Sequence, residues 1–509
     1  MTLARTWAVA LNGAEGHLVD VEADQSDQTP DFRIIGLADK ALGEAVQRVN
    51  NACANSGSPL PRRRLTVNLS PAALPKHGSG FDVAIAVAAL ATEGALDGAA
   101  VARTVHLGEL GLDGRLRPTP GVLPAVRAAV RAGLRRVVVP HANGEEARLV
   151  TDAEIHAAGS LAEVLALHGA DVAVPDIEPV RAPPSPVIDS GEDIDLGDVV
   201  GQSEAVEALV VAAVGGHHLL MSGPPGAGKT MLARRLPTIL PDLDDDAALA
   251  VASIASLAGA RVTRLSHTPP FVAPHHSASV AALVGGGSRV VRPGAIVRAS
   301  EGVLFLDEAG EFPASALDAL RQPLESGRID IHRAGVSASF PARFQMILAT
   351  NPCPCGDYGV RGGDCRCAPM AIRRYLGKLS GPLLDRVDIE LHLTRVSHAH
   401  RSASTSALTS KAARIRVEQA RERAARRLRD TPWRRNADVP GTWLRGGPVA
   451  PEPIVRRPLD AALHRGALTL RGYDRVLRVA WSLADLDGRE RLSVDDVGRA
   501  LYLKRGLVA

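Results

Sequence analysis

Hydrophobic and polar residues alternate in short blocks along the N-terminal part of the chain, and the period switches between two patterns. A period of two is typical of half-buried strands, and a period of about 3.6 is typical of amphipathic helices. An Asp113-Gly114 pair between two strand-like runs indicates a tight turn. The patterns predict strands at Trp7–Val21, Arg64–Leu69 and Arg136–Val139, helices at Ala38–Ala54, Phe81–Leu90 and Pro124–Ala132, and a hairpin over Thr104–Arg117.

Changes of pattern divide the rest of the chain. Residues 1–172 form the mixed region, and 173–195 hold five prolines and six acidic residues, which predicts a stiff, polar linker. Residues 196–395 repeat strand, glycine-rich loop, helix and strand, as in an α/β nucleotide-binding core. Residues 396–455 are polar and basic and are expected to be an insert or linker. Helical periodicity returns over 456–509, so a small helical domain is expected there.

The composition limits the range of possible functions but does not identify one. The 509 residues are 46% hydrophobic and 23% charged, with 59 basic against 56 acidic side chains, so a nucleic-acid-binding surface would have to be local. Met1–Ala10 lacks the long apolar core of a signal peptide. The apolar run at Phe81–Leu90 is too short to span a bilayer. We therefore expect a cytoplasmic protein without a membrane segment.

A glycine-rich loop carries the clearest chemical signal. It fits the pattern G-x-x-x-x-G-K-[ST] without a gap, between a short apolar strand at His218–Ser222 and a helix at Thr230–Ile239. Backbone N–H groups of such a loop surround phosphate oxygens, the lysine reaches the β- and γ-phosphates, and the hydroxyl ligates Mg²⁺. A chance glycine loop is the alternative. The predicted loop consists of Gly223, Pro224, Pro225, Gly226, Ala227, Gly228, Lys229 and Thr230.

Two later strands end in residues suited to the same site. Val303–Leu306 is a buried strand followed by Asp307, which is expected to hold Mg²⁺, and by Glu308, which is expected to polarise the attacking water. The strand Phe344–Thr350 ends at Asn351, whose amide can orient that water. The alternative for Asn351 is a turn residue before Pro352.

Four of the five cysteines are packed into fifteen residues. Cys353, Cys355, Cys365 and Cys367 form C-x-C-x₉-C-x-C, and two such knuckles can surround Zn²⁺ tetrahedrally. Two disulfides or free thiols are the alternatives, although neighbouring C-x-C pairs are poorly suited to internal disulfides. Glycines between the knuckles give the loop freedom to close.

The loop, the acidic strand end and the Asn-ended strand, in this order, resemble an AAA+ ATPase. Lys229 and Asp307 are 78 positions apart, which leaves a surplus that holds Pro274-His275-His276-Ser277. A hairpin is expected at Arg328–Phe340, before the Asn351 strand. These two inserts resemble the helix-2 insert and the presensor hairpin of the clade that contains magnesium chelatase and the MCM helicases.

Longer stretches resemble one branch of that clade over nearly the whole chain. Ala273–His276, Gly302–Glu308, Asn351–Cys355 and Ser380–Arg386 are similar to the ComM/YifB family, which is magnesium-chelatase-like. The resemblance implies an AAA+ core that uses ATP and Mg²⁺, a C-terminal helical lid, and a ring of six subunits.

The resemblance also assigns two arginines. Arg386, in Leu384-Asp385-Arg386-Val387-Asp388, corresponds to the arginine that acts on the neighbouring subunit's ATP. A guanidinium there would stabilise charge on the γ-phosphate, and an ion pair within the chain to Asp388 or Asp385 is the alternative. In the lid, Arg471 corresponds to the sensor-2 arginine. Arg475 and Arg478 lie on the same helical face and compete for that role.

Residues 1–172 resemble the Lon-type protease domain on a ribosomal-protein-S5-like α+β fold, through Pro75–Asp82, Gly108–Arg115 and Gly121–Leu123. The serine of that family's Ser–Lys dyad falls at Gly80 and the lysine at Leu123, and neither residue can perform the chemistry. Ser79 is shifted by one position. We therefore expect a domain without protease activity that is structural or faces DNA.

Two basic features are candidates for DNA contact. Lys411–Arg435 contains ten basic and three acidic residues, and the presensor hairpin carries Arg328, His332 and Arg333. Only six of the 59 basic residues are lysine, so arginine is common throughout, and a solvated helix is the alternative for the first feature. A subunit-contact loop is the alternative for the hairpin.

Taken together, these features predict an AAA+ ring motor on DNA, which the resemblance links to branch migration or D-loop extension in recombination and natural transformation. A magnesium-chelatase-type motor subunit that drives metal insertion into a porphyrin is the main alternative. An ATP-dependent protease or unfoldase is disfavoured by Gly80 and Leu123.

Overall fold

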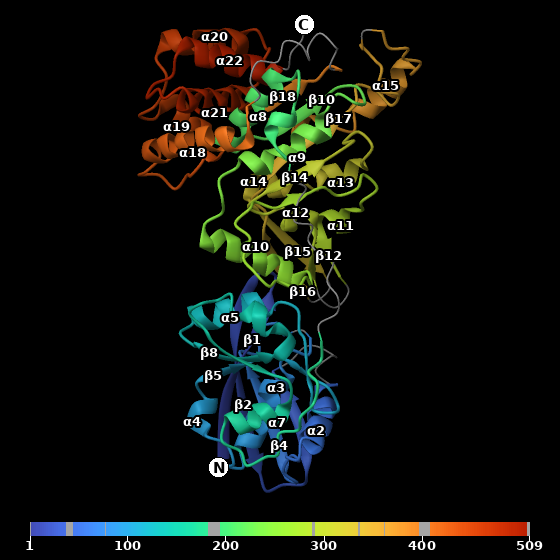
Figure 1. The fold of residues 1–509 in the computed structure, drawn as a ribbon, viewed down its shortest axis with the longest axis vertical. Coiled ribbons are helices and arrows are strands. Elements are labelled where there is room, and N and C mark those ends of the chain that lie inside the picture. Colours follow the sequence, from blue (N-terminus) through green and yellow to red (C-terminus); the bar gives the residue numbers. More distant parts are fainter. Residues whose placement is uncertain are drawn as a thin grey trace.

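The N-terminal domain forms one end of an elongated molecule, and the phosphate-loop core and the C-terminal helices form the other end (Figure 1). The computed structural model describes residues 2–36, 44–76, 78–181, 194–287, 291–333, 336–360, 362–395 and 408–505.

A seven-stranded mixed sheet organises the N-terminal domain, in the order β3-β4-β2-β1-β5-β8-β9. Successive residues of β1 point to opposite faces, so Ala8 and Ala10 join a core under α2, α3 and α7 while Val9 joins a second core with α5 and α6. The strands are β1 (Thr2–Asn12), β2 (Glu15–Ser26), β3 (Asp31–Ile35), β4 (Arg64–Ser70), β5 (Thr104–His106), β8 (Arg136–Pro140) and β9 (Glu154–Ala158). The helices are α2 (Ala45–Asn55), α3 (Asp82–Ala91), α4 (Gly98–Val101), α5 (Val122–Arg131), α6 (Gly144–Ala147) and α7 (Leu161–Leu167).

The prediction of one strand over Trp7–Val21 is wrong. The alternation is real, but β1 and β2 pair antiparallel around a turn, with Asn12 opposite Glu15. Gly13 takes a φ of +65°, a left-handed conformation that glycine adopts without steric cost. The predicted hairpin at Asp113-Gly114 is confirmed by the pairing of β6 (Glu109–Leu110) with β7 (Leu116–Arg117), whereas β5 joins the large sheet instead. The first residues of the helix predicted over Ala38–Ala54 lie outside the described residues.

Five parallel strands form the sheet of the core, in the order β11-β14-β17-β10-β18. All four residues of β14 are buried, and they alternate between two cores. Such strands are covered by other elements on both faces, as the apolar run in the sequence predicts. The strands are β10 (Leu219–Ser222), β11 (Phe271–Val272), β14 (Val303–Leu306), β17 (Gln345–Thr350) and β18 (Ile389–His392).

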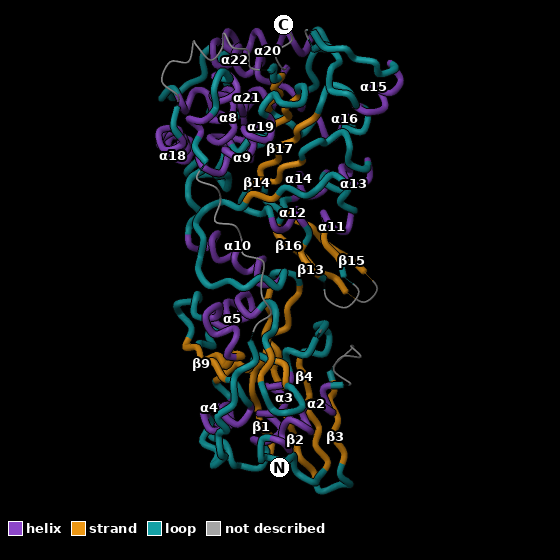
Figure 2. The backbone as a smooth tube through the Cα atoms, turned by 45° about the vertical axis from the view of Figure 1, so that its right-hand side comes forward, coloured by secondary structure: helices purple, strands orange, loops and turns teal. Residues whose placement is uncertain are grey.

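An insert between α9 (Lys229–Ile239) and β14 joins the core to the N-terminal domain. Its helix α10 (Asp245–Leu257) packs against α5, where Ala252 shares a core with Val122. The predicted hairpin is confirmed as β15 (Arg328–Arg333) and β16 (Val336–Pro341), and it lies between the core and the N-terminal domain (Figure 2). The backbone N–H of Ala14, in the β1–β2 turn, donates a hydrogen bond to the Ser339 carbonyl at 3.4 Å. The remaining elements of the insert are α11 (Val280–Val284), β12 (Gly285–Gly286), β13 (Arg292–Pro293) and α12 (Ala295–Arg298).

The C-terminal helices cover one side of the core. They include α18, which falls in the stretch expected to be an insert or linker but packs as part of the fold. Ala413 and Val417 of α18 share a core with α8 (Ser203–Gly215) and α21. The helices are α18 (Ser410–Arg427), α19 (Gly441–Gly446), α20 (Pro453–His464), α21 (Leu470–Leu486) and α22 (Val494–Arg505). None of the helices in the ranges given above is long and apolar enough to cross a bilayer.

Candidate nucleotide-binding site

The register of the core sheet places three predicted site residues side by side, at the carboxyl ends of neighbouring strands. Ser222 of β10 lies opposite Thr350 of β17, so Gly223 and Asn351 follow adjacent strand ends. The Gly223 N–H donates to the Thr350 carbonyl at 3.2 Å. β14 also pairs with β17, and Asp307 follows its last residue. In open parallel sheets, ligands bind outside the carboxyl ends of the strands, which is where these residues lie.

Within the phosphate loop, Lys229 is anchored by three oxygen acceptors. Its Nζ donates to the carbonyls of Gly223 at 2.6 Å and Pro224 at 3.1 Å, and to Oδ1 of Asn351 at 2.9 Å. Gly226 and Gly228 take φ values of +78° and +86°, which curve the loop ahead of α9. Burial lowers the pKa of Lys229, while the Asp307 and Glu308 carboxylates oppose that shift. A negatively charged ligand would favour the charged form of this lysine.

Two hard oxygen donors lie side by side next to the loop. The Thr230 hydroxyl donates to Oδ2 of Asp307 at 2.7 Å, although the two residues are 77 positions apart. Oxygen donors of this kind are the ligands that Mg²⁺ prefers, so the donor set fits the metal that the sequence predicts.

Glu308 has an unusual backbone and an unpredicted partner. Its φ is +52°, a left-handed conformation that is rare outside glycine and is often found at functional sites. Its Oε2 lies 3.0 Å from Nδ1 of His276, which comes from the insert. The rings of His275 and His276 are 4.1 Å apart, and His275 also contacts the Ser277 hydroxyl. The Pro-His-His-Ser motif, which marks the insert and belongs to the stretch that resembles the ComM/YifB family, was the available signal for His276, but it did not predict a contact with Glu308.

Arg386 is buried and already paired within the chain. It forms an ion pair with Glu325 of α14 (Arg321–Ser326), and it also donates to the Pro382 carbonyl. Glu325 was not among the expected partners. Asp388 pairs with Arg475 instead, at 2.6 Å. An action of Arg386 on a neighbouring subunit would therefore have to compete with Glu325.

The three lid arginines have different surroundings. Arg475 bonds to Asp388 and to the Asp385 carbonyl, and Arg478 donates to the Val439 carbonyl at 2.8 Å. Arg471, in the first turn of α21, is exposed and forms no hydrogen bond or ion pair with the other residues that the structure describes. Of the three, it is the one left available for a ligand.

The four clustered cysteines come together. Their sulfur atoms all lie within 4.8 Å of one another, with Cys353 buried and Cys355 exposed. Burial opposes ionisation of Cys353, but hydrogen bonds from Cys355 and from the Tyr358 N–H lower its pKa to about 7. A backbone hydrogen bond at Cys367 favours ionisation of Cys365, but burial and its Cys355 and Cys353 neighbours raise its pKa to about 12. Charge on one sulfur therefore disfavours charge on another, which a bound cation would reverse.

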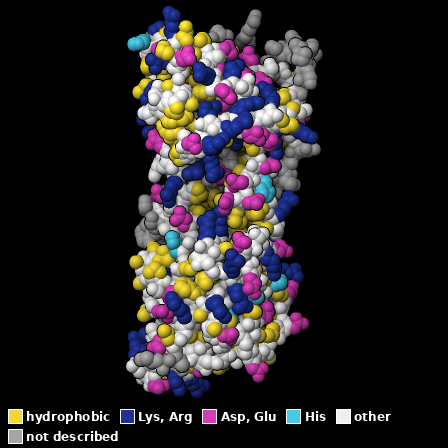
Figure 3. All heavy atoms as spheres, turned by 90° about the vertical axis from the view of Figure 1, so that its left-hand side faces the viewer, with side chains coloured by type: hydrophobic (Ala, Val, Ile, Leu, Met, Phe, Trp, Pro, Cys, Tyr) yellow, Lys and Arg dark blue, Asp and Glu magenta, His cyan; other side chains and the backbone are white. Residues whose placement is uncertain are grey.

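The arginines of α18 are mostly used inside the chain. Arg414 pairs with Asp242, Arg416 with Glu207, and Arg427 with Asp485. Arg421 donates two hydrogen bonds to the Ala213 carbonyl of α8, at 3.0 and 2.6 Å. Basic and acidic side chains alternate over this end of the molecule in Figure 3. The exposed basic residues of the stretch that bond to no other described residue are Lys411, Arg426, Arg429 and Arg434.

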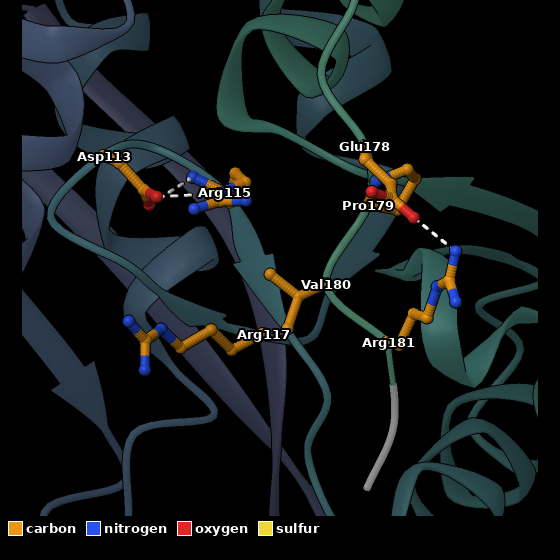
Figure 4. A pocket seen from close by; sticks show the side chains of 7 residues that line it. All are labelled: Asp113, Arg115, Arg117, Glu178, Pro179, Val180 and Arg181. Carbon is orange, nitrogen blue, oxygen red and sulfur yellow. Dashed lines mark hydrogen bonds and ion pairs between the residues drawn. The ribbon is translucent and has the colours of Figure 1, made fainter.

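A polar pocket in the N-terminal domain is separate from this site (Figure 4). Two of its arginines are neutralised within the pocket, Arg115 by Asp113 and Arg181 by Glu178. Arg117, Pro179 and Val180 complete its lining. The pocket therefore offers a small net positive charge but none of the predicted catalytic residues.

The positions to which the sequence resemblance assigns a protease dyad are occupied by residues without its chemistry. Leu123 is fully buried, and Ser79 hydrogen-bonds to Glu109 rather than to a lysine. Lys76 is nearby in the sequence, but its Nζ donates to three backbone carbonyls, those of Gly36, Pro71 and Leu74. The Lys76 ammonium group is therefore engaged in hydrogen bonds that hold the backbone.

Family models and known relatives match most of the chain. Models of the magnesium chelatase subunit ChlI match residues 195–401 and 21–143, and a model of its C-terminal region matches 407–504. An uncharacterized protein of Mycobacterium tuberculosis is 48% identical over 508 residues, covering 99% of both chains. The competence protein ComM of Haemophilus influenzae is 39% identical over 98% of this chain and 97% of its own, and YifB of Salmonella typhimurium is 38% identical over 97% and 95%.

The chain belongs to the ComM/YifB family of magnesium-chelatase-like AAA+ proteins. A mixed α/β structure with a parallel sheet and a helical C-terminal region is consistent with that family. Membership implies that this ComM/YifB protein uses ATP and Mg²⁺ and has ATPase activity.

Proposed function

We propose that this ComM/YifB protein is a ring-forming ATPase that moves on DNA, in branch migration or D-loop extension during recombination and natural transformation. The observation that carries the proposal is the convergence of Lys229, Thr230, Asp307, Glu308 and Asn351 at one edge of the core sheet. The name of the Haemophilus influenzae relative, a competence protein, supports the link to DNA uptake.

In this proposal each residue at the edge has one task. The phosphate loop binds the triphosphate, and Lys229 contributes a positive charge to its β- and γ-phosphates. Thr230 and Asp307 would hold Mg²⁺, which neutralises phosphate charge. Glu308 polarises the attacking water and Asn351 orients it. Arg471 senses the nucleotide from the lid.

The site is completed by a second subunit. Arg386 would leave Glu325 and approach the γ-phosphate bound by the neighbouring subunit, where it would stabilise charge in the transition state. A contact in which one subunit's arginine meets the next subunit's nucleotide is head-to-tail, and it must close into a ring or polymerise. We expect a hexamer, as the family resemblance implies.

DNA would contact the hairpin and the exposed basic residues of the α18 region. Arg328 is exposed on β15, and its Nη2 donates to the Ser339 hydroxyl at 3.0 Å. The side chains of His332 and Arg333, the other hairpin candidates, lie outside the described residues. Lys411, Arg426, Arg429 and Arg434 are free to contact phosphates, which is a more limited surface than the whole basic stretch.

The four cysteines are proposed to hold one Zn²⁺. A Zn–S bond is about 2.3 Å, so sulfurs at the corners of a tetrahedron lie about 3.8 Å apart. The distances from Cys365 Sγ to Cys353 Sγ and Cys355 Sγ are 3.8 and 3.6 Å. Cys353 and Cys355 are 3.2 Å apart at sulfur, too far for a disulfide bond of about 2.05 Å.

A magnesium-chelatase motor is the second candidate, because chelatase subunit models match three parts of the chain. The ATPase rate with single-stranded, duplex and forked DNA at several salt concentrations separates the two. The DNA motor predicts stimulation that falls as salt rises. Equal rates with and without every DNA would refute it. A protease function is excluded from the proposal by Gly80 and Leu123.

A further inference from the structure

We infer that the cysteine knuckle, residues 353–367, is a metal-dependent brace that fixes the phosphate loop in its nucleotide-binding shape. The inference rests on the proposed nucleotide site and adds a structural role for the bound Zn²⁺. The knuckle begins two residues after Asn351. It is also connected to the phosphate loop in two other ways, directly through Gly356 and indirectly through Arg395.

The first contact is made by the backbone of Gly356. This residue follows Cys355 and takes a φ of +89°. A Cβ atom added there would overlap Cδ of Pro225, the third residue of the phosphate loop. Gly356 is therefore packed directly against the loop, at a point where any side chain would push the two apart.

The second contact is a bridge through Arg395. Its Nε donates to the Pro225 carbonyl at 3.3 Å, and its Nη2 lies 3.4 Å from Oδ1 of Asp357. Asp357 comes directly after Gly356, so the same turn of the knuckle reaches Pro225 by packing and by this bridge.

The knuckle is also continuous with a residue that anchors Lys229. Asn351 accepts from Lys229 Nζ, and Cys353 follows after a single proline. The Gly356 N–H donates to the Cys353 carbonyl at 3.0 Å, and the Tyr358 N–H donates to Cys353 Sγ at 3.4 Å. The position of Cys353 thus fixes both Asn351 and the turn that contacts Pro225.

A metal makes this arrangement rigid. Without a cation the four clustered sulfur atoms cannot all be thiolates, whereas Zn²⁺ holds four thiolates at fixed distances and contributes directly to local folding. The loop between the cysteine pairs is rich in glycine and has no helix or strand of its own among its described residues. Without the metal, the turn at Gly356 would become more mobile, and the phosphate loop would lose its packing contact with that turn.

Matched glycine variants test the brace without touching the cysteines. Gly356→Ala puts a methyl group against Pro225, whereas Gly359→Ala, at a φ of +72° in the same knuckle, meets no atom within 4 Å. Both variants keep all four cysteines and should keep about one zinc per chain by elemental analysis. We expect Gly356→Ala to raise the dissociation constant of a fluorescent ADP analogue at least tenfold. Gly359→Ala should raise it less than threefold.

The metal itself is tested with Cys355→Ser/Cys365→Ser. This variant should lose its zinc, bind the ADP analogue at least tenfold more weakly, and show faster hydrogen exchange in peptides that span 223–230. Peptides of the β1–β2 hairpin should be unchanged. Wild-type protein without zinc, or a zinc-free variant with unchanged affinity and loop exchange, would overturn the inference.

These readouts separate the inference from the proposed function. Wild-type protein that contains zinc but binds no nucleotide would refute the proposed nucleotide site, and loop exchange would still test the brace. Wild-type protein that binds nucleotide with equal affinity in the Gly356→Ala and Gly359→Ala variants would refute the brace alone.

Discussion

His276 Nδ1 lies 3.0 Å from Glu308 Oε2, so the insert directly contacts the residue proposed to activate water. Glu308 has a left-handed backbone, and the imidazole restrains its side chain. His276→Ala should therefore lower kcat roughly tenfold through misplacement of the carboxylate, with the KM for ATP changed less than twofold. Steady-state ATPase kinetics would measure both constants.

The conservative variant His276→Gln supplies the control for that experiment. Its amide can still bond to the carboxylate, so it should recover part of the lost kcat. Full activity in His276→Ala would mean that the contact has no role in positioning Glu308.

Substitutions of Lys229 and of Glu308 should reduce ATPase activity for different reasons. Lys229→Ala removes the charge that the loop holds for phosphate, so nucleotide affinity should fall at least tenfold. Glu308→Gln keeps the shape of the site, so affinity should stay within threefold of wild type while turnover falls by about 10²–10⁴. Titration of a fluorescent nucleotide and single-turnover hydrolysis give the two quantities. Turnover retained in either variant would contradict the site.

The buried Asp388–Arg475 ion pair should hold the lid to the core. Burial opposes ionisation of Asp388, but Arg475 and His217 hold its pKa well below the usual value. Its stabilising contribution is therefore complete above about pH 4, the ordinary value for aspartate, and is lost as the pH falls below that value.

Asp388→Asn should lower the stability of the core by about 3–5 kcal/mol at pH 7, since it leaves Arg475 without its charge partner. Trp433, Trp443 and Trp481 all lie in the C-terminal region, so the change in tryptophan fluorescence during urea unfolding reports mainly on it. Between pH 5 and pH 3 the variant should lose less stability than wild type. Equal pH dependence in the two proteins would exclude Asp388 as the group responsible.

The exposed Arg426, near the C-terminal end of α18, and Arg429, just beyond it, should contribute to DNA affinity. Arg426→Ala/Arg429→Ala removes two cations that bond to no other described residue, so binding should weaken and the salt dependence should decrease by about 1.8 in log–log slope. Arg457→Ala/Arg465→Ala, in the α20 region, removes the same charge from another exposed surface. Equal losses of DNA affinity in the two double variants would indicate a general effect of charge and would contradict a specific role of Arg426 and Arg429.

Spacing along the chain was sufficient to predict that the candidate nucleotide-site residues lie together, because they follow the ends of parallel strands. Lys229 and Asn351 are 122 positions apart, yet both are placed by the register of β10 and β17. The cysteine cluster was predictable for a different reason, since its four ligands are close in the sequence. The β1–β2 turn was missed because the alternation continues across it, although Asn12-Gly13 is itself a hairpin signal.

Contacts that depend on how side chains of distant segments are directed were not predictable from pattern. No local feature indicates that Glu325 neutralises Arg386, or that the insert brings His276 to Glu308. The basic stretch shows the same limit: its charge count is correct, but helix packing assigns Arg414, Arg416 and Arg427 to acidic partners within the chain. Side-chain direction, which decides such roles, depends on tertiary packing.

The most direct test of an active site shared between subunits is to mix two inactive variants. Glu308→Gln keeps Arg386 but cannot activate water. Arg386→Ala keeps Glu308 but lacks the arginine, so its turnover should be about 10³-fold lower than that of the wild type. In a mixed ring, Arg386 of the first variant can act on nucleotide bound by the second. We predict that ATPase activity after mixing rises well above the sum of the separate activities. No recovery in mixed rings, together with full activity of Arg386→Ala as a monomer, would contradict the account.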